Sequence, residues 1–166
     1  FMLCFLDRDG IINTDHGYVG TIERFKLIVE IIPILKYLKS VGYEFVVVTN
    51  QSGINRGYYS YKEFIDLSLY IIKLFENYSI PIEINYCRSL PEENSICRKP
   101  NIGMFLKYEI SDDDIMIGDK DTDMLAAARI GINNRFLINK IPQGPFTKHF
   151  NNHLELYGYL LQTFSI

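Results

Sequence analysis

Carboxylate and hydroxyl side chains follow three of the apolar runs in this sequence. Asp7 and Asp9 come directly after the first run, Thr49 ends the second, and Asp119 ends a later one. Carboxylates that gather at one place repel one another, and Mg²⁺ neutralises them through oxygen ligands. Asp7, Asp119 and the backbone carbonyl of Asp9 are therefore candidate ligands. Asp7 could attack a phosphorus atom as a nucleophile, while Asp9 protonates the leaving oxygen and later activates water.

Phosphoryl transfer also requires positive and hydrogen-bonding groups around the phosphate oxygens. Thr49 offers a hydroxyl group, and Lys99 in "CRKP" offers a compact charge. Lys120 in "GDKDTD" is placed to hold a carboxylate or to meet the substrate. Taken singly, these motifs also fit an Asp-Gly turn, a strand followed by a polar loop, and acids at a helix N-terminus. Their order along one chain favours phosphoryl chemistry.

Apolar runs alternate with helical patterns, which predicts an α/β fold with a mostly parallel central sheet. The expected strands are 2–7, 43–50, 82–87, 114–119 and 134–138, and the expected helices are 30–42, 61–77, 101–109, 122–131 and 153–164. Ser60 and Glu63 predict a capping box at the start of the second helix. In an open α/β sheet, ligands bind at the carboxyl ends of the strands, where the polar residues above fall.

Composition limits the class of protein. With 166 residues, 48% hydrophobic and 22% charged, the chain fits one domain over 1–166. A net charge of -3 without a Lys/Arg run favours neither nucleic acid nor an anionic membrane as a partner. The first apolar run is shorter than the roughly 20 residues that span a bilayer. We expect Met2 to be the natural start, with no secretory signal, and the chain to be a cytoplasmic monomer.

Four segments resemble the motifs of the haloacid dehalogenase superfamily of phosphatases: "DRDG", the threonine of "VVTNQSG", the lysine of "CRKP", and "GDKDTD". The resemblance covers residues 3–138. It implies a Rossmann-like three-layer fold, with Asp7 as nucleophile, Asp9 as general acid/base, Thr49 and Lys99 on the phosphate, and Mg²⁺ on Asp7, Asp9 and Asp119. The superfamily's dehalogenases lack the second aspartate, so Asp9 favours a phosphatase. Short connections after the first and third strands leave no room for a large cap domain.

Within the superfamily, longer segments resemble the phosphatases of D-glycero-D-manno-heptose 1,7-bisphosphate and their histidinol-phosphate relatives. "QSGINRG" favours the heptose enzymes. Together with Arg8, which either turns away or meets the substrate, the implied substrate-binding residues are Asp15, His16, Gly17, Tyr18, Thr49, Asn50, Gln51, Ser52, Arg98, Lys99 and Lys120. Arg98 suits the phosphate that is not cleaved. Both Arg98 and Arg56 could instead be exposed loop charges, and His16 could face solvent.

The resemblance implies a Mg²⁺-dependent phosphatase that removes the 7-phosphate of the heptose bisphosphate through an aspartyl-phosphate, for the synthesis of a bacterial surface glycan such as lipopolysaccharide. One alternative is a phosphatase of histidinol phosphate or another small phosphomonoester. Another is a receiver-like phosphoacceptor or binding module. Asp9 argues against the last reading, because a positioned base hastens hydrolysis of the acyl-phosphate.

The loop before "CRKP" departs from the family pattern. There the family typically binds structural Zn²⁺ through Cys-x-His and Cys-x-Cys, whereas this chain has Ser89 and Ser95 in place of the histidine and the first cysteine of the second pair. Tetrahedral structural zinc normally needs all four ligands. We therefore expect no zinc, and reduced thiols at Cys87 and Cys97, with a disulfide between them as the alternative.

Overall fold

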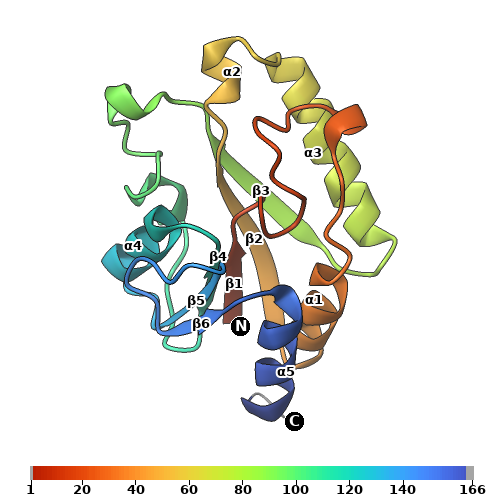
Figure 1. Ribbon diagram of the computed structural model, residues 1–166, viewed down its shortest axis with the longest axis vertical. Helices are drawn as coiled ribbons and strands as arrows, with labels where there is room; N and C mark the ends of the chain where they lie inside the picture. Colours follow the sequence, from red (N-terminus) through yellow and green to blue (C-terminus); the bar gives the residue numbers. More distant parts are fainter. Residues whose placement is uncertain (1, 164–166) are drawn as a thin grey trace.

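The computed structural model describes residues 2–163. Six parallel strands form one sheet in the order β3-β2-β1-β4-β5-β6 (Figure 1). The strands are β1 (Met2–Leu6), β2 (Tyr43–Asn50), β3 (Ile82–Cys87), β4 (Ile115–Gly118), β5 (Asn134–Ile138) and β6 (Lys148–Phe150). This arrangement confirms the predicted α/β class.

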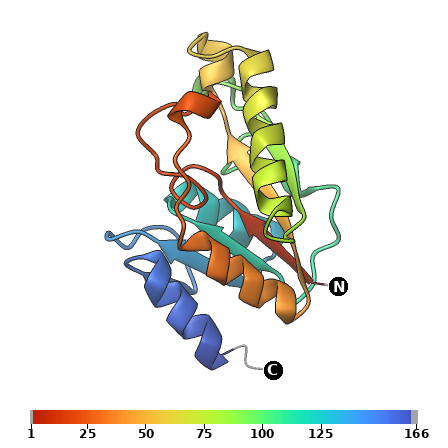
Figure 2. The same cartoon turned by 90° about the vertical axis from the view of Figure 1, so that its right-hand side faces the viewer.

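Helices cover both faces of the sheet. The helices are α1 (Ile31–Ser40), α2 (Gly53–Arg56), α3 (Tyr61–Glu76), α4 (Asp121–Ile130) and α5 (His153–Thr163), with short 3₁₀ turns η1 (Ile22–Arg24), η2 (Pro91–Glu93) and η3 (Gly103–Phe105). Alternate residues of a strand point to opposite faces. Accordingly, Cys4 and Leu6 of β1 pack in the core beneath α1, α3 and α5 (Figure 2), whereas Leu3 and Phe5 pack in a second core with α4 and η3.

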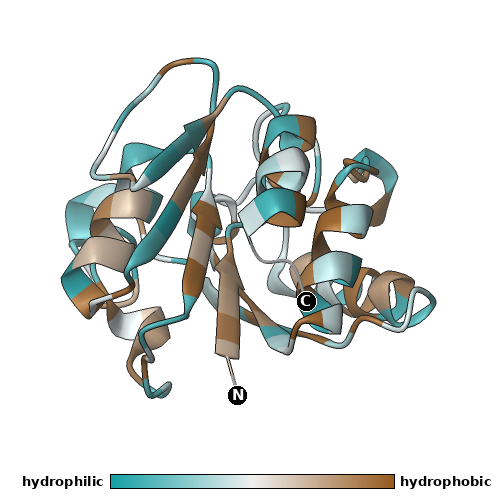
Figure 3. Cartoon of the chain, turned by 90° about the horizontal axis from the view of Figure 1, so that it is seen from below, coloured by the Kyte–Doolittle hydropathy of each residue, from teal (hydrophilic) through white to brown (hydrophobic). Residues whose placement is uncertain are grey.

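The central strands are apolar on both faces because helices cover both sides (Figure 3). The helices show the opposite pattern, with one apolar and one polar face. At the start of α3, the Ser60 hydroxyl accepts from the Glu63 amide at 3.0 Å, and the Glu63 carboxylate accepts from the Ser60 amide at 2.8 Å. The predicted capping box is thus confirmed.

One predicted feature differs from the structure and two elements were not predicted. The expected helix 101–109 contains only the turn η3. Strand β6 is three residues long and starts with an exposed lysine, too short for a periodic signal. Helix α2 is a single turn that ends at Gly57, whose φ is +77°. The last residue of the predicted helix 153–164 and the expectation about Phe1 lie outside the described residues.

Membrane insertion through a helix has no support between residues 2 and 163, where none of the helices combines the length and the apolar character that a bilayer span requires.

Candidate active site

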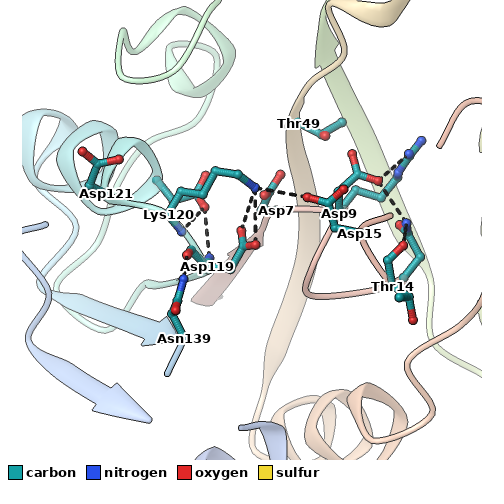
Figure 4. Close-up of polar contacts among 12 residues, drawn as sticks. Asp7, Asp9, Thr14, Asp15, Thr49, Asp119, Lys120, Asp121 and Asn139 are labelled. Atoms are coloured by element: carbon teal, nitrogen blue, oxygen red, sulfur yellow. Dashed lines mark hydrogen bonds and ion pairs between the residues drawn. The ribbon is translucent and has the colours of Figure 1, made fainter. Parts of the chain in front are cut away.

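The carboxyl ends of the parallel strands surround a cavity of about 450 Å³. Asp7 follows β1, Asn50 ends β2, and Asp119 follows β4; Figure 4 shows Asp7 and Asp119 between the strand ends. Many of the residues expected from the sequence line this cavity: Asp7, Asp9, Asp15, Gly17, Tyr18, Asn50, Gln51, Ser52, Arg98, Lys99 and Lys120. The structure therefore brings together segments that lie up to about 110 residues apart in sequence, from Asp7 to Lys120.

A cluster of acids lies at the base of the cavity. Oxygen atoms of Asp7, Asp119 and Asp123 lie within 4.8 Å of one another. Burial raises the pKa of Asp119 to about 8, and the negative charges of Asp7 and Asp123 contribute to this rise. A divalent cation would remove that repulsion, and an oxygen-only donor set suits Mg²⁺. The residues present thus fit the metal that the sequence predicts.

Asp123 was not among the predicted site residues, although it is buried at the centre of this cluster. Its Oδ2 accepts from the backbone amides of Asp119 and Lys120, each at 3.1 Å. Its Oδ1 accepts from the Lys99 ammonium at 2.6 Å. Both oxygens of Asp123 therefore have short bonds within the protein, whereas the Asp119 carboxylate has the Lys120 ammonium at 3.3 and 3.4 Å, so Asp7 and Asp119 are the better-placed metal ligands. The position of Asp123 in the first turn of a helix, three residues after Lys120, was the available signal.

Lys99 carries its positive charge into the acidic cluster. The side chain is only 2% exposed, and its ammonium donates to Asp7 Oδ1 at 3.1 Å and to the Val48 carbonyl at 2.6 Å. Burial opposes this charge, but the negative charges of Asp123 and Asp7 outweigh it and raise the pKa of Lys99. Lys99 is consequently a fixed cation that touches Asp7.

Three side chains hold the second aspartate of the motif. Asp9 Oδ1 accepts from Arg8 at 2.7 Å and from Asn13 at 2.9 Å, and its Oδ2 accepts from Gln51 at 3.0 Å. Arg8 is 1% exposed and also donates to the Val19 carbonyl. Arg8 therefore does not line the cavity; it is buried beside the cavity and its guanidinium binds the Asp9 carboxylate.

Gln51 also connects Asp9 to Thr49. The Gln51 amide donates to Thr49 Oγ1 at 2.9 Å, and the Tyr59 hydroxyl donates to Gln51 Oε1. Burial raises the pKa of Tyr59 to about 12, so this tyrosine remains a neutral donor. Thr49 itself is fully buried at the end of β2. Its hydroxyl therefore binds Gln51, and Gln51 rather than Thr49 lines the cavity.

Gly10 and Asn139 both adjoin Asp119: Gly10 leaves room for its side chain, and Asn139 binds its backbone carbonyl. Gly10 has φ +86°, and a Cβ atom at this position would lie 2.2 Å from Asp119 Oδ2, so only glycine fits. Asn139 follows β5 and donates to the Asp119 carbonyl at 2.8 Å (Figure 4). The rule that polar residues after parallel strands reach the site would have identified Asn139 from the sequence.

The loop after β1 forms the outer wall of the cavity. Asp15 accepts from the Gly17 amide at 3.1 Å and pairs with Lys120 at 3.6 Å, and Lys120 also pairs with Asp119 at 3.3 Å. His16 contacts Arg24 through both ring nitrogens, at 2.8 Å to the carbonyl and 2.9 Å to the guanidinium. His16 is exposed and holds the loop rather than lining the cavity.

The loop before Lys99 is closed by a disulfide between Cys87 and Cys97, whose Cα atoms lie 5.5 Å apart. The expectation of reduced thiols was wrong. The chain returns from the end of β3 to the residue before Arg98, which brings the two sulfur atoms together. Ser89 and Ser95 are also close, with hydroxyl oxygens 3.9 and 3.4 Å from Cys97 Sγ.

Comparison with known proteins identifies relatives of the chain. A family model described as "Polynucleotide kinase 3 phosphatase" matches residues 5–129. The chain is 44% identical over 145 residues to the D-glycero-beta-D-manno-heptose-1,7-bisphosphate 7-phosphatase of Helicobacter pylori, covering 83% of this chain and 84% of the relative. It is 38% identical over 162 residues to the D-glycero-alpha-D-manno-heptose-1,7-bisphosphate 7-phosphatase of Campylobacter jejuni, covering 93% of each.

Solved structures share the fold. The crystal structure of D,D-heptose 1,7-bisphosphate phosphatase from B. bronchiseptica, complexed with magnesium and phosphate, has a TM-score of 0.83 at 23% identity and covers 98% of this chain and 99% of that one. The corresponding enzyme from Burkholderia thailandensis has a TM-score of 0.70 at 21% identity, with full coverage of both chains. The chain is thus a phosphatase of the haloacid dehalogenase superfamily, and it belongs to the family of heptose-1,7-bisphosphate 7-phosphatases.

Proposed function

We propose that this chain is a Mg²⁺-dependent enzyme that removes the 7-phosphate of D-glycero-D-manno-heptose 1,7-bisphosphate. The observation that carries this proposal is the pair Asp7 and Asp9 at one cavity, with Lys99 bonded to the first acid and three donors on the second. The names of the relatives supply the substrate. The structure supplies side chains with the chemistry that hydrolysis of a phosphate ester requires.

Asp7 and Asp119, with the Asp9 carbonyl, would hold the Mg²⁺. When bound, the ion would offset the charge of the carboxylates and of the incoming phosphate. Lys99 contacts Asp7 directly, so its charge would favour approach of the phosphate oxygens to that carboxylate. The resemblance assigns to Thr49 a further hydrogen bond to the phosphate, and the Thr49 hydroxyl, which here accepts from Gln51, keeps its own proton to donate.

The reaction would proceed in two steps at Asp7. A carboxylate oxygen of Asp7 attacks phosphorus, and the bond from phosphorus to the sugar oxygen breaks as Asp9 gives that oxygen a proton. Asp9 then takes a proton from water, the water oxygen attacks the aspartyl-phosphate, and inorganic phosphate leaves with Asp7 restored. Arg8, Asn13 and Gln51 would keep Asp9 in place for both proton transfers.

The open mouth of the cavity suits a small sugar phosphate. Tyr18 and Ser52 line the mouth, and Arg98 lines it from the loop closed by the disulfide. Arg98 is half-buried and donates to the Ser89 carbonyl at 3.1 Å, which aims a planar, charged group at the cavity. We assign to Arg98 the phosphate that is not cleaved.

The remaining expectations belong to this proposal. We propose that the enzyme acts as a monomer in the cytoplasm, on a sugar phosphate rather than on nucleic acid or a membrane, and that its product enters the synthesis of a surface glycan. We also propose that it carries no structural zinc, since the disulfide takes up the two cysteine sulfurs that zinc would need.

A panel of phosphate esters tests the substrate. With Mg²⁺ present, we expect kcat/KM for the heptose bisphosphate to exceed that for p-nitrophenyl phosphate and for an oligonucleotide 3′-phosphate by roughly 100-fold or more, because two phosphates are recognised instead of one. A higher value for histidinol phosphate would contradict the heptose assignment. A stable acyl-phosphate with little release of phosphate would favour the phosphoacceptor module.

A further inference from the structure

Arg56, at the end of α2, is exposed and contacts two residues that line the cavity, although the proposed reaction gives it no role. Its Nε donates to Ser52 Oγ at 3.1 Å, and its guanidinium carbon lies 5.7 Å from the centre of the Tyr18 ring. Ser52 and Tyr18 both line the cavity. A cation stacked on an aromatic face is held in a defined place without losing its charge. Arg56 is thus fixed beside the mouth by two lining residues.

The charge of Arg56 acts on Arg98, which lines the same cavity from a different loop. Burial lowers the pKa of Arg98, and the positive charge of Arg56 lowers it further, although Glu92 partly offsets both effects. Within residues 2–163, neither guanidinium has an acidic side chain within ion-pair distance. The charge of Arg56 thus acts on Arg98, and neither guanidinium is ion-paired with a carboxylate in the described residues.

Such a pair of cations costs energy in the free protein and is stabilised when an anion binds between or beside them. The guanidinium group presents several N–H donors in one plane, which matches the oxygens of a phosphate. Asp7 is buried, whereas Arg98 is half-buried and Arg56 is exposed, so the arginines supply a positive region nearer the solvent than the acids. A ligand with two phosphates would match both regions.

We propose that Arg56 is a specificity-determining residue, which together with Arg98 forms a subsite for the second phosphate of the substrate. The inference rests on the proposed function, because only a bisphosphate offers that group. Tyr18 and Ser52 hold Arg56 in place for this contact. The subsite would favour heptose 1,7-bisphosphate over heptose 7-phosphate, which lacks the second phosphate.

Arg88 offers a matched control close to Arg56 in the fold. Its guanidinium carbon lies 5.7 Å from the centre of the Tyr61 ring, and its Nε donates to Asn55 at 2.6 Å. The two arginines therefore make the same kinds of contact with a tyrosine and with a polar side chain. Neither Tyr61 nor Asn55 is among the residues that line the cavity.

The experiment compares Arg56→Gln and Arg88→Gln with the wild type on two substrates, heptose 1,7-bisphosphate and heptose 7-phosphate. We expect Arg56→Gln to lower the ratio of kcat/KM for the bisphosphate over the monophosphate roughly tenfold, mainly through KM, as the loss of one charged contact implies. Arg56→Lys keeps the charge without the planar donors, so its kcat/KM ratio should lie between those of the wild type and Arg56→Gln. Arg88→Gln should keep the wild-type ratio.

The other outcomes separate the two proposals. If the wild type prefers the bisphosphate and Arg56→Gln keeps that preference, the subsite assignment is overturned while the proposed function stands. If the wild type turns over both substrates equally well, the subsite and the assignment of Arg98 to the second phosphate are overturned; if it turns over neither, the proposed function is overturned. An equal loss on both substrates would also overturn the subsite, because it would mean that Arg56 only shapes the loop; thermal melts of each variant establish that it is folded.

Discussion

At the scale of single residues, Asp9 depends on neighbours whose roles no spacing rule would suggest. Its carboxylate accepts from Arg8, Asn13 and Gln51. The chemistry of Asp9 could be predicted from its place two residues after Asp7. The burial of Arg8 could not, because it depends on how the following loop folds to bring the Val19 carbonyl over the guanidinium. Local spacing therefore predicts which acids line the cavity better than it predicts the side chains that support them.

Gly10 provides a test of how tightly Asp119 is confined. In Gly10→Ala, the new methyl group would meet Asp119 Oδ2 at 2.2 Å and displace this candidate metal ligand. We expect phosphatase activity to fall by roughly 100-fold, the loss that a displacement of about 1 Å can cause in an active site. Steady-state kinetics at saturating Mg²⁺ measure the effect.

Gly131→Ala controls for backbone strain. Gly131 ends α4 with φ +95°, but a Cβ atom there would meet no atom within 4 Å. Both variants should lose about 1–2 kcal/mol of unfolding free energy, the cost of left-handed backbone for a residue with a Cβ atom. Only Gly10→Ala should lose activity. If both variants kept wild-type activity, the crowding of Asp119 would not matter for catalysis.

At the scale of elements, the parallel strands and their periodic helices could be predicted, whereas the short connections could not. The apolar run 45–48 is buried on both faces as expected for a covered strand. Strand β6 has three residues and helix α2 has four, and segments this short show no hydrophobic period in the sequence. The sequence offered the disulfide only as the alternative to reduced thiols, because only the folded path of the 88–97 loop brings Cys87 and Cys97 together.

The disulfide positions the loop that leads to Arg98, since Arg98 follows Cys97 directly and bonds to the Ser89 carbonyl inside the closed loop. We expect Cys97→Ser to lose about 2–3 kcal/mol of unfolding free energy, the effect of opening a short loop. KM for the bisphosphate should rise more than kcat falls, because Asp7 and Asp123 still hold Lys99. Urea unfolding and kinetics measure the two effects.

Treatment with a reductant supplies the control for this prediction. Dithiothreitol should change the wild type in the same direction as Cys97→Ser and should leave the variant unchanged, because the variant has lost the disulfide and its two cysteines, Cys4 and Cys87, are buried. A wild type that keeps its KM and stability after reduction, with reduction verified by thiol titration, would contradict the positioning role of the disulfide.

At the scale of the whole molecule, the last helix contacts the loop that carries Asp9. His153 at the start of α5 is buried, and its Nε2 lies 2.9 Å from the Ile11 carbonyl, two residues beyond Asp9. Helix α5 also packs against α1 through the core that contains Leu156 and Leu160. The sequence predicted this helix docked on the core. Its contact with the loop after β1 joins residues 142 positions apart, which no local pattern can indicate.

The free energy of unfolding of the protein should depend on pH through His153. Burial lowers the pKa of His153 below its ordinary value of 6.5, although the bond to Ile11 and the charge of Glu30 oppose the shift. The unfolded chain therefore binds a proton more readily, and stability should be lost as pH falls below about 6.5. Urea unfolding between pH 7.5 and 5.5 should show a smaller decrease for His153→Gln, which can still donate to Ile11 but does not titrate. An equal decrease in both proteins would contradict this account.

The central claim is that Asp7 is the nucleophile of a heptose bisphosphate phosphatase. It is tested most directly by release of inorganic phosphate from heptose 1,7-bisphosphate with Mg²⁺, by the wild type and by Asp7→Asn. The amide is nearly isosteric but cannot form the aspartyl-phosphate, so we expect the rate to fall on the order of 10³-fold or more. Equal rates for the two proteins would contradict the account.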